Sequence, residues 1–392
     1  MFYKFIFQSF IIYSLKSILK IIKIIIPILR NQTSGYPRFV IDFENRFKNF
    51  IGKKYALTFS NGTSALKAAL FSMGIKKNFK ILVPEYTFHA TIDPVVNLGY
   101  EIEFVKVSPN NLSIDVDDLN SKISNDSKVL IVTHPFGFPA NMPKISKICK
   151  KNRILVIEDC SHSHGASINE IKVGKFSNIS IFSLQGNKSV SAGEGGIALT
   201  NSKNYYKKML IYGHFANRIK DIQFSNYRDF SLTGFGEKMR CNPLGIILAK
   251  EDFKFLENSN KIKNKIYNFL KSNLASREDI YIIKNEYGSA PGGFFSGIPI
   301  LVNKKICNQL NNELRKNKIY LLPDPWFKLN NLKIYNFKNR NKLLYESYRL
   351  ISDKKYIQDN IFENFLVYLI PLPRFFNYDY KKLLNILNSL NK

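Results

Sequence analysis

Short apolar runs alternate with amphipathic helical patterns between about residue 55 and residue 210. Apolar runs of this length, bounded by Gly, Asn and Ser, are typical of buried strands. The predicted strands are Tyr55–Phe59, Lys80–Val83, Glu101–Val107, Val129–Thr133, Ile154–Ile157, Ile179–Ser183 and Gly196–Thr200. The predicted helices between them are Thr63–Met73, Ala90–Leu98, Val116–Ile123 and Met142–Lys151. The alternation predicts an α/β domain with a mainly parallel seven-stranded sheet flanked by helices, whose strand order stays open.

The pattern changes beyond about residue 255, where Gly-rich turns become rare and helical stretches rich in Lys and Asn take over. A strand over Phe365–Ile370, the tripeptide Pro371-Leu372-Pro373 and an amphipathic helix from Tyr378 follow. We therefore expect an N-terminal segment over 1–33, a large domain over 34–255 and a smaller α+β domain over 256–392.

Residues 1–30 are almost wholly apolar and basic, unlike the rest of the chain. On a helical wheel most of the Phe, Ile and Leu residues of this segment point elsewhere, while five polar residues gather on one side: Ser9, Lys16, Lys20, Lys23 and Arg30. A spanning helix needs ~20 largely uncharged residues, and the apolar run between Lys4 and Lys16 is too short. The pattern predicts an amphipathic helix over 2–30 on the inner face of a membrane. An uncleaved signal anchor, or a helix packed on the protein or its dimer partner, remains the alternative.

The formal charge of +28 favours anionic partners, but the Lys residues are spread along the chain and form no Arg-rich run. We therefore expect no nucleic-acid partner. The four cysteines form no C-x-x-C pair and the five histidines no H-E-x-x-H motif, so neither a disulfide framework nor a metal site is expected. This cysteine usage fits a reducing, cytoplasmic location.

Three segments could hold a charged cofactor. The turn Ser60-Asn61-Gly62-Thr63-Ser64 opens a predicted helix, where free backbone N–H groups and hydroxyls can hold a phosphate. Asp159 ends a predicted strand, and Lys188 lies in a loop before Gly193-Glu194-Gly195-Gly196. A phosphate site, a strand-end carboxylate and a loop amine suit pyridoxal 5′-phosphate (PLP), whose aldehyde binds Lys and whose pyridine nitrogen pairs with Asp. Taken singly, each has a plain structural interpretation as a helix cap, a turn cap or a solvated side chain.

The sequence resembles the DegT/DnrJ/StrS family of PLP-dependent, fold type I sugar aminotransferases over roughly residues 34–255, because the family's motifs occur in it in the same order. The matching segments are Ser34-Gly35-Tyr36 with Phe43-Glu44, Ser60 to Leu66, Pro84 to Phe88, Thr133 to Gly137, Glu158-Asp159 with His164-Gly165-Ala166, and Lys188 with Gly193 to Gly196. The C-terminal domain matches only loosely, mainly through Pro371-Leu372-Pro373.

The resemblance implies roles for named residues. Lys188 would be the Schiff-base lysine and proton carrier, and Asp159 the partner of the pyridine nitrogen. Phe88 would stack on the cofactor, His162 would lie near its phenolic oxygen, and Gly62, Thr63 and Ser183 would hold its phosphate. Many family members have G-x-N-x-R where this chain has Gly236-Glu237-Lys238-Met239-Arg240, so Lys238 stands where an Asn reaches the partner subunit's cofactor.

The resemblance also implies a homodimer that transfers an amino group, with glutamate as the expected donor, to a keto group of a nucleotide-linked sugar. Such products are precursors of cell-surface polysaccharides or glycoconjugates. Arg218 and Arg240 are candidates for binding the substrate diphosphate. The alternatives are a PLP-dependent sugar dehydratase of the same family, which has His in place of the Schiff-base Lys, and a non-catalytic, membrane-associated member.

Overall fold

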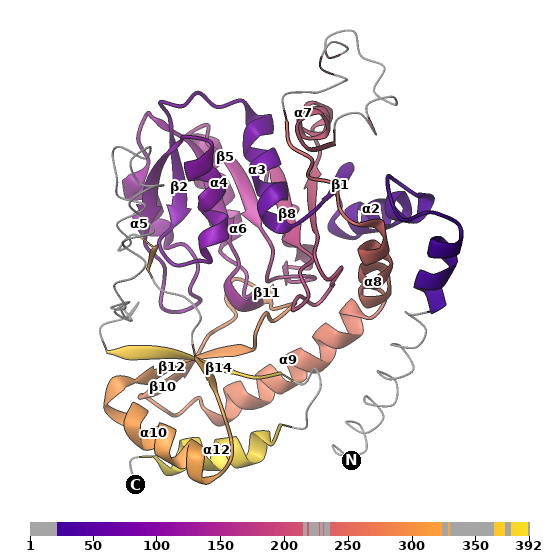
Figure 1. The fold of residues 1–392 in the computed structure, drawn as a ribbon. Helices are drawn as coiled ribbons and strands as arrows, with labels where there is room; N and C mark the ends of the chain where they lie inside the picture. The colour runs from indigo at the N-terminus through magenta and orange to yellow at the C-terminus, as the bar shows by residue number, and fades with distance from the viewer. Residues whose placement is uncertain are drawn as a thin grey trace, which may run out of the picture.

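The computed structural model describes residues 22–214, 218, 227, 230, 236–323, 328–329, 364–372 and 378–390. A large sheet wrapped by helices occupies the upper part of Figure 1, and a second sheet with its own helices lies below it. The long helix α9 (Leu256–Asn273) runs from one part to the other. It begins at the residue where the sequence places the start of the small domain, although that boundary stays a prediction.

The central sheet has seven strands in the order β1-β9-β8-β5-β4-β2-β3, which confirms the predicted strand number and supplies the order. Its strands are β1 (Tyr55–Phe59), β2 (Lys80–Pro84), β3 (Glu101–Val105), β4 (Ser127–Thr133), β5 (Leu155–Asp159), β8 (Ile179–Ser183) and β9 (Gly196–Thr200). Only β9 runs against its two neighbours, while the pairs among β3, β2, β4, β5 and β8 are parallel. The sheet is thus mainly parallel, as expected.

Successive strand residues point to opposite faces of the sheet, and helices bury both faces. One face packs against α3 (Gly62–Met73), α4 (Asp93–Asn97) and α7 (Lys203–His214). The other packs against α2 (Arg38–Ile51), α5 (Val116–Lys122), α6 (Met142–Lys151) and α8 (Pro243–Phe253). The sequence predicted α3, α5 and α6 to within a residue or two. It placed one helix over Ala90–Leu98, where the structure has the short 3₁₀ turn η1 (His89–Thr91) followed by α4.

The second sheet is antiparallel, in the order β10-β12-β14-β13. Its strands are β10 (Ile280–Ile282), β12 (Ile298–Asn303), β13 (Leu322–Pro323) and β14 (Phe365–Ile370), and α10 (Lys304–Lys316) and α12 (Tyr380–Ser389) accompany it. The predicted strand at Phe365 is confirmed at both ends. A small third sheet joins β11 (Ser289–Ala290) to the hairpin β6 (Ser167–Ile168) and β7 (Ile171–Lys172), and so ties the two parts together.

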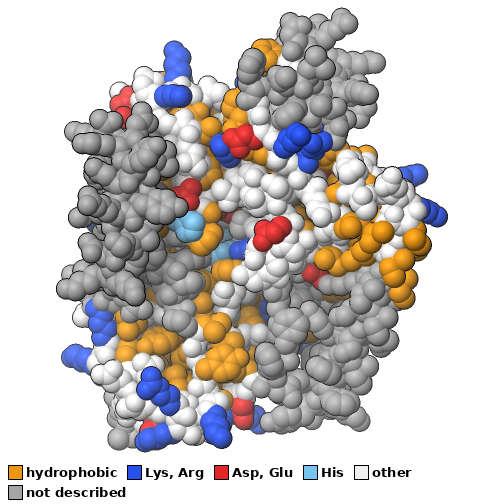
Figure 2. Space-filling view, viewed as in Figure 1, with side chains coloured by type: hydrophobic (Ala, Val, Ile, Leu, Met, Phe, Trp, Pro, Cys, Tyr) orange, Lys and Arg blue, Asp and Glu red, His pale blue; other side chains and the backbone are white. Residues whose placement is uncertain are grey.

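The N-terminal segment enters the described part of the chain as a helix over residues 22–29, and residues 1–21 of the predicted amphipathic helix lie outside it. Lys23 Nζ lies 2.6 Å from Glu251 Oε2 on α8, so this turn of helix is fixed to the large domain. Several of its apolar side chains stay exposed: Ile22, Ile25, Ile26, Ile28 and Leu29. They form part of the orange surface at the right of Figure 2. Among the described helices, none is long and apolar enough to cross a membrane.

Candidate active site

A cavity of about 490 Å³ opens at the carboxyl ends of the central strands. In open α/β sheets ligands bind at this edge, because the loops that leave the strands converge there. The cavity wall includes seven of the eight residues that the sequence singled out: Gly62, Thr63, Phe88, Asp159, His162, Ser183 and Lys188. The eighth, Lys238, is exposed and is not among the cavity residues, so its role toward a partner subunit stays a prediction.

The first turn of α3 forms one end of the cavity. Asn61 caps this helix by accepting a hydrogen bond from Ser64 N at 2.7 Å. A Cβ atom on Gly62 would lie 3.0 Å from Ser183 Cβ, and a Cβ on Gly196 would lie 2.3 Å from Asn61 O. Glycine at both positions therefore lets the start of α3 approach β8 and β9 closely. The free N–H groups of this turn and the two hydroxyls of Thr63 and Ser183 suit a phosphate.

Asp159 ends β5 and is almost buried, with 8 % of its surface exposed. Thr91 Oγ1 donates to one carboxylate oxygen at 2.8 Å, and Ser161 N donates to the other at 3.1 Å. Both contacts fix the orientation of the carboxylate at the strand end. Thr91 was missed by sequence reasoning, although a hydroxyl in the segment that follows β2, a strand of the same sheet, is a signal that could have found it.

Lys188 lies in the turn between β8 and β9, where its backbone N–H donates to Gln185 O at 2.9 Å. Its side chain reaches the cavity with only 8 % of the residue exposed. Phe88, by contrast, is 47 % exposed at the cavity wall and packs against His89, so its ring face is open to a planar ligand. The interpretation of Phe88 as a stacking residue remains a prediction.

His162 follows Asp159 on the same loop. Its Nδ1 accepts a hydrogen bond from Phe136 N at 3.4 Å, which places the proton of a neutral ring on Nε2. Burial, together with the charges of Lys188 and His164, lowers the pKa of His162 well below its ordinary value. A neutral imidazole that carries its proton on Nε2 can donate to an oxygen of a bound ligand.

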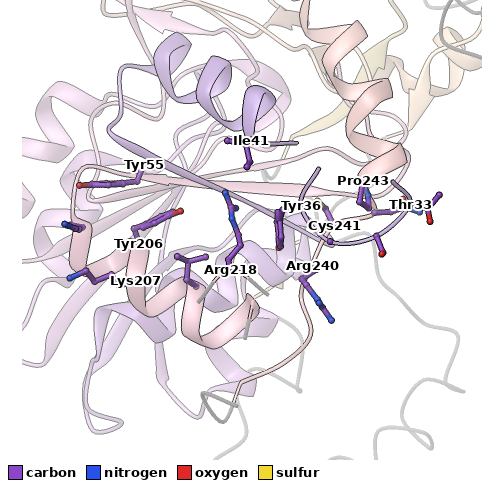
Figure 3. Close-up of a pocket in the computed structure, with 15 residues that line it drawn as sticks. Thr33, Tyr36, Ile41, Tyr55, Tyr206, Lys207, Arg218, Arg240, Cys241 and Pro243 are labelled. Carbon is purple, nitrogen blue, oxygen red and sulfur yellow. The ribbon is translucent and has the colours of Figure 1, made fainter. Parts of the chain in front are cut away.

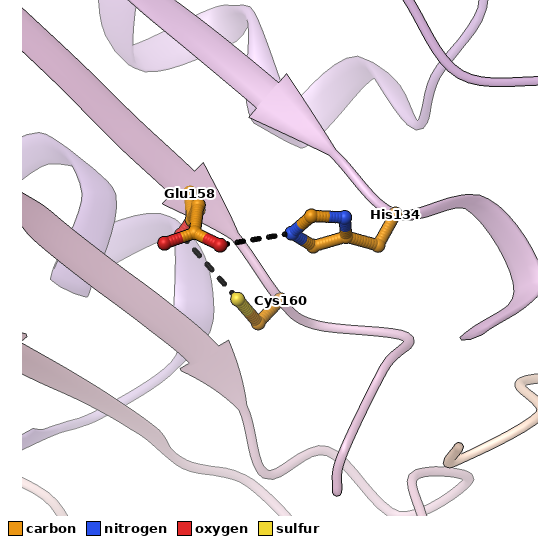
Figure 4. Close-up of side chains that lie close together, drawn as sticks. All are labelled: His134, Glu158 and Cys160. Carbon is orange, nitrogen blue, oxygen red and sulfur yellow. Dashed lines mark hydrogen bonds and ion pairs between the residues drawn. The ribbon is translucent and has the colours of Figure 1, made fainter. Parts of the chain in front are cut away.

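A buried trio of His134, Glu158 and Cys160 lies where β4 and β5 end, and His134 also lines the cavity (Figure 4). Gly174 N and Ser177 N donate to the two oxygens of Glu158, and His134 Nε2 lies 3.3 Å from one of them. Burial and the nearby carboxylates raise the pKa of Cys160 well above its ordinary value, so the thiol keeps its proton. We interpret the trio as a structural polar cluster, because its acceptors already have donors.

A larger cavity, of about 1160 Å³, lies between the residues after the N-terminal helix, α7 and the segment over 240–243 (Figure 3). Arg218 lies beside Tyr36 here, with its guanidinium 4.4 Å from the ring centre. It also forms two hydrogen bonds with Glu44, of 2.9 and 2.7 Å. Arg218 and Arg240, the sequence candidates for a substrate diphosphate, therefore line this cavity and not the one that holds Lys188.

Comparison with known proteins decides the family. The sequence model of the DegT/DnrJ/EryC1/StrS aminotransferase family matches residues 20–346. The chain belongs to this family. Members of the family use PLP, so the predicted cofactor and the predicted fold type are both confirmed.

Curated relatives include the GDP-perosamine synthases of Escherichia coli O157:H7 and Vibrio cholerae. The first is 30 % identical over 250 residues, which is 63 % of this chain and 66 % of the relative. The second is 32 % identical over 177 residues, which is 45 % of this chain and 48 % of the relative. The chain thus spans between about half and two thirds of the length of these relatives. Among solved structures, an aminotransferase from Psychrobacter cryohalolentis superposes with a TM-score of 0.78 at 19 % identity, covering 94 % of this chain and 95 % of the other.

The residues of the cavity fit PLP on the chain's own geometry. The glycine-lined start of α3 lies at one end, a fixed carboxylate lies at the strand end, and a nearly buried lysine lies in the same wall. Sequence reasoning missed one further wall, because Phe295 and Ser296 come from the C-terminal part of the chain, where the family pattern is loose.

Proposed function

We propose that the protein is a PLP-dependent aminotransferase that moves an amino group from glutamate to a keto group of a nucleotide-linked sugar. The observation that carries the proposal is the placement of Lys188 and Asp159 in one cavity beside the first turn of α3. The names of the curated relatives support a nucleotide-sugar substrate. The product would serve in the synthesis of cell-surface polysaccharides or glycoconjugates.

Each residue of the cavity has a separate role toward the cofactor. When bound, PLP supplies an electron sink for the charge that develops on the substrate carbon. The Nζ of Lys188 would hold the cofactor, and the same amine would carry a proton at the substrate carbon. Asp159 would favour a protonated pyridine nitrogen, since Thr91 and Ser161 keep its carboxylate in place. Gly62, Thr63 and Ser183 would bind the phosphate.

Borohydride reduction of the PLP-loaded protein, followed by peptide mapping, tests the assignment of Lys188. We expect the pyridoxyl group on Lys188, and no label in Lys188→Arg. Lys263→Arg is the matched control, because Lys263 Nζ lies near the site but donates to Ser189 Oγ and Gly293 O. Label on another lysine of the wild-type protein would refute the assignment.

The substrate class is tested with glutamate and a panel of nucleotide-linked keto sugars, followed by mass spectrometry of the products. An amino sugar supports transfer, whereas loss of a hydroxyl without gain of nitrogen would support the dehydratase alternative. The presence of Lys188 favours transfer, because the family resemblance gives dehydratases a His at that position. Conversion of glutamate without any sugar product would leave an aminotransferase with another acceptor.

A homodimer is the assembly that we propose. It rests on the family resemblance and on Lys238, which is exposed and does not line the cavity of its own chain. Light scattering coupled to gel filtration should give twice the chain mass of 45.3 kDa. A monomer that keeps full activity would contradict the proposal.

We also propose that the N-terminal segment contacts the inner face of a membrane. Lys23 ties residues 22–29 to α8 and leaves Ile25, Ile26 and Leu29 exposed on the same stretch. Because Lys23 pairs with Glu251, it contributes less to lipid attraction than the sequence pattern suggested. Full-length protein should sediment with vesicles that contain anionic lipid, while a chain starting at Asn31 should not. Equal behaviour of the two proteins would refute the membrane contact.

A further inference from the structure

The ring of Phe295 is inserted between two functional side chains of the cavity. Lys188 Nζ lies 3.6 Å from the centre of this ring, and the His162 ring stacks against it with 3.9 Å between centroids and 24° between planes. Lys188 and His162 come from loops that follow β8 and β5, whereas Phe295 comes from the loop over 291–297 that leads into β12. A carbon ring thus separates an amine from an imidazole.

Several contacts hold the loop over 291–297 in this position. Gly293 N donates to Asn260 Oδ1 at 2.9 Å, and Gly293 O accepts from Lys263 Nζ at 2.8 Å and from Ser189 Oγ at 2.6 Å. Gly293 has a φ of +75°, and a Cβ there would lie 2.5 Å from His162 O. The loop is therefore fixed both to α9 and to the segment that carries Lys188. These contacts hold the backbone next to Phe295 in place.

The position of the Phe295 ring affects the hydrogen bonding and the protonation of the His162 imidazole. The groups that face this imidazole are Lys188 and His164, with Asp159 in the same cavity wall. The aromatic ring covers one face of the imidazole and prevents a direct hydrogen bond between it and the amine. The Phe136 N–H donates to Nδ1, so that the proton of a neutral ring lies on Nε2.

We propose that Phe295 is a positioning residue: its ring holds the His162 imidazole in place, keeps water from one of its faces and separates it from the Lys188 amine. The inference rests on the cofactor site proposed above, but not on the sugar substrate. It also gives the C-terminal part of the chain a direct role in the site. An aromatic face next to an ammonium group and a stacked imidazole is a stable arrangement in its own right.

The test is a titration of the imidazoles by NMR in the full-length chain with ¹³C-labelled histidine, without added cofactor. The chain has five histidines, and His162→Gln assigns the resonance of His162. In the wild-type protein we expect this resonance to keep the position of a neutral ring to well below the ordinary titration range of histidine, because burial and the charges of Lys188 and His164 lower the pKa of His162. In Phe295→Leu, water reaches the ring and part of the burial is lost, so the midpoint should rise toward the ordinary value. The positive charge of the Lys188 amine opposes this rise and does not cause it.

Two further variants separate positioning from a general effect on the loop. Phe295→Tyr keeps the aromatic face and should titrate like the wild type. Phe294→Leu is the matched control, because Phe294 is buried against Phe138 and Tyr267 and contacts neither Lys188 nor His162 in the described contacts. An unchanged midpoint in Phe295→Leu, or an equal rise in Phe294→Leu, would overturn the proposal. Since no sugar is present, failure of the proposed substrate class would leave this result unaffected.

Discussion

Replacing the buried carboxylate of Glu158 by an amide should lower the stability of the protein substantially. Glu158 is completely buried, and its two oxygens accept hydrogen bonds from Gly174 N at 2.8 Å and Ser177 N at 3.0 Å. Glu158→Gln keeps the shape of the side chain but supplies only one acceptor oxygen. One backbone N–H must then face an NH₂ group, and the contact with His134 loses its charge.

The expected loss follows from these contacts. A buried donor without an acceptor costs about 1–3 kcal/mol. The upper end of this range applies, because the group lost is a charged carboxylate that accepts from two backbone donors. We expect the free energy of unfolding at pH 7 to fall by about 3 kcal/mol. Glu257→Gln is the matched control, because 67 % of the Glu257 side chain is exposed and its pairing with Lys172 is long, at 3.9 Å. Its effect should stay within about 0.5 kcal/mol.

The loss should depend on pH in a defined direction. Burial alone would raise the pKa of Glu158, but His134 and the two backbone donors outweigh burial and lower it below the ordinary value of 4.5. A carboxylate with a lowered pKa stabilises the fold above its unfolded pKa, and this contribution is lost as the pH falls through the folded pKa. The difference between wild type and Glu158→Gln should therefore be full at pH 7 and shrink below about pH 4.5.

Urea unfolding followed by circular dichroism, at pH 7 and at several values below pH 4.5, measures both effects. The slopes with denaturant must agree between variants before midpoints are compared. A change under about 0.5 kcal/mol at pH 7 would refute the assignment of Glu158 as a buried charged acceptor. A loss that stays constant into acid would show that packing, and not charge, is responsible.

Three further changes test the site and the assembly. Asp159→Asn should keep the fold and PLP binding but slow the half-reaction with glutamate by about a hundredfold or more, measured by stopped-flow absorbance; near-normal rates would contradict the role of Asp159. Gly196→Ala should abolish PLP binding or folding, since the new Cβ would meet backbone atoms of Asn61 at 2.3–2.4 Å, while Gly186→Ala, with 3.6 Å to its nearest neighbour, should be tolerated. Lys238→Ala should weaken PLP binding in an equilibrium titration without changing the melting temperature of the cofactor-free protein; unchanged affinity would mean that another residue contacts the partner's phosphate.

Hydrophobic patterning predicted the central sheet well because its strands are buried on both faces. Strands such as β1, β8 and β9 are short, apolar and bounded by turn residues, so their ends were predicted to the residue. Strand order could not be predicted, because it depends on crossover connections and not on local pattern. The two-residue strands β6 and β7 were missed because they are too short to show a pattern; they pair with each other in a hairpin, and only β6 also pairs with β11 far along the chain.

The same reasoning explains which site residues the sequence revealed. Asp159, Ser183 and the turn at Gly62 follow strands of one sheet, so the topology alone brings them to one edge. Lys188 follows from the glycine-rich turn beside it. These residues share local signals that do not depend on the rest of the chain.

Phe295 carries no such local signal. Its position depends on how the C-terminal part of the chain packs on the part that contains the central sheet. Its ring reaches Lys188 only because Asn260 and Lys263 on α9 hold Gly293, and because Gly292 N donates to Gly137 O across the junction. The residue that separates the amine from the imidazole thus lies in the C-terminal part of the chain, outside the segments on which the sequence resemblance rested. Variation in that region can alter the surroundings of Lys188 and His162 while the strand-end residues stay the same.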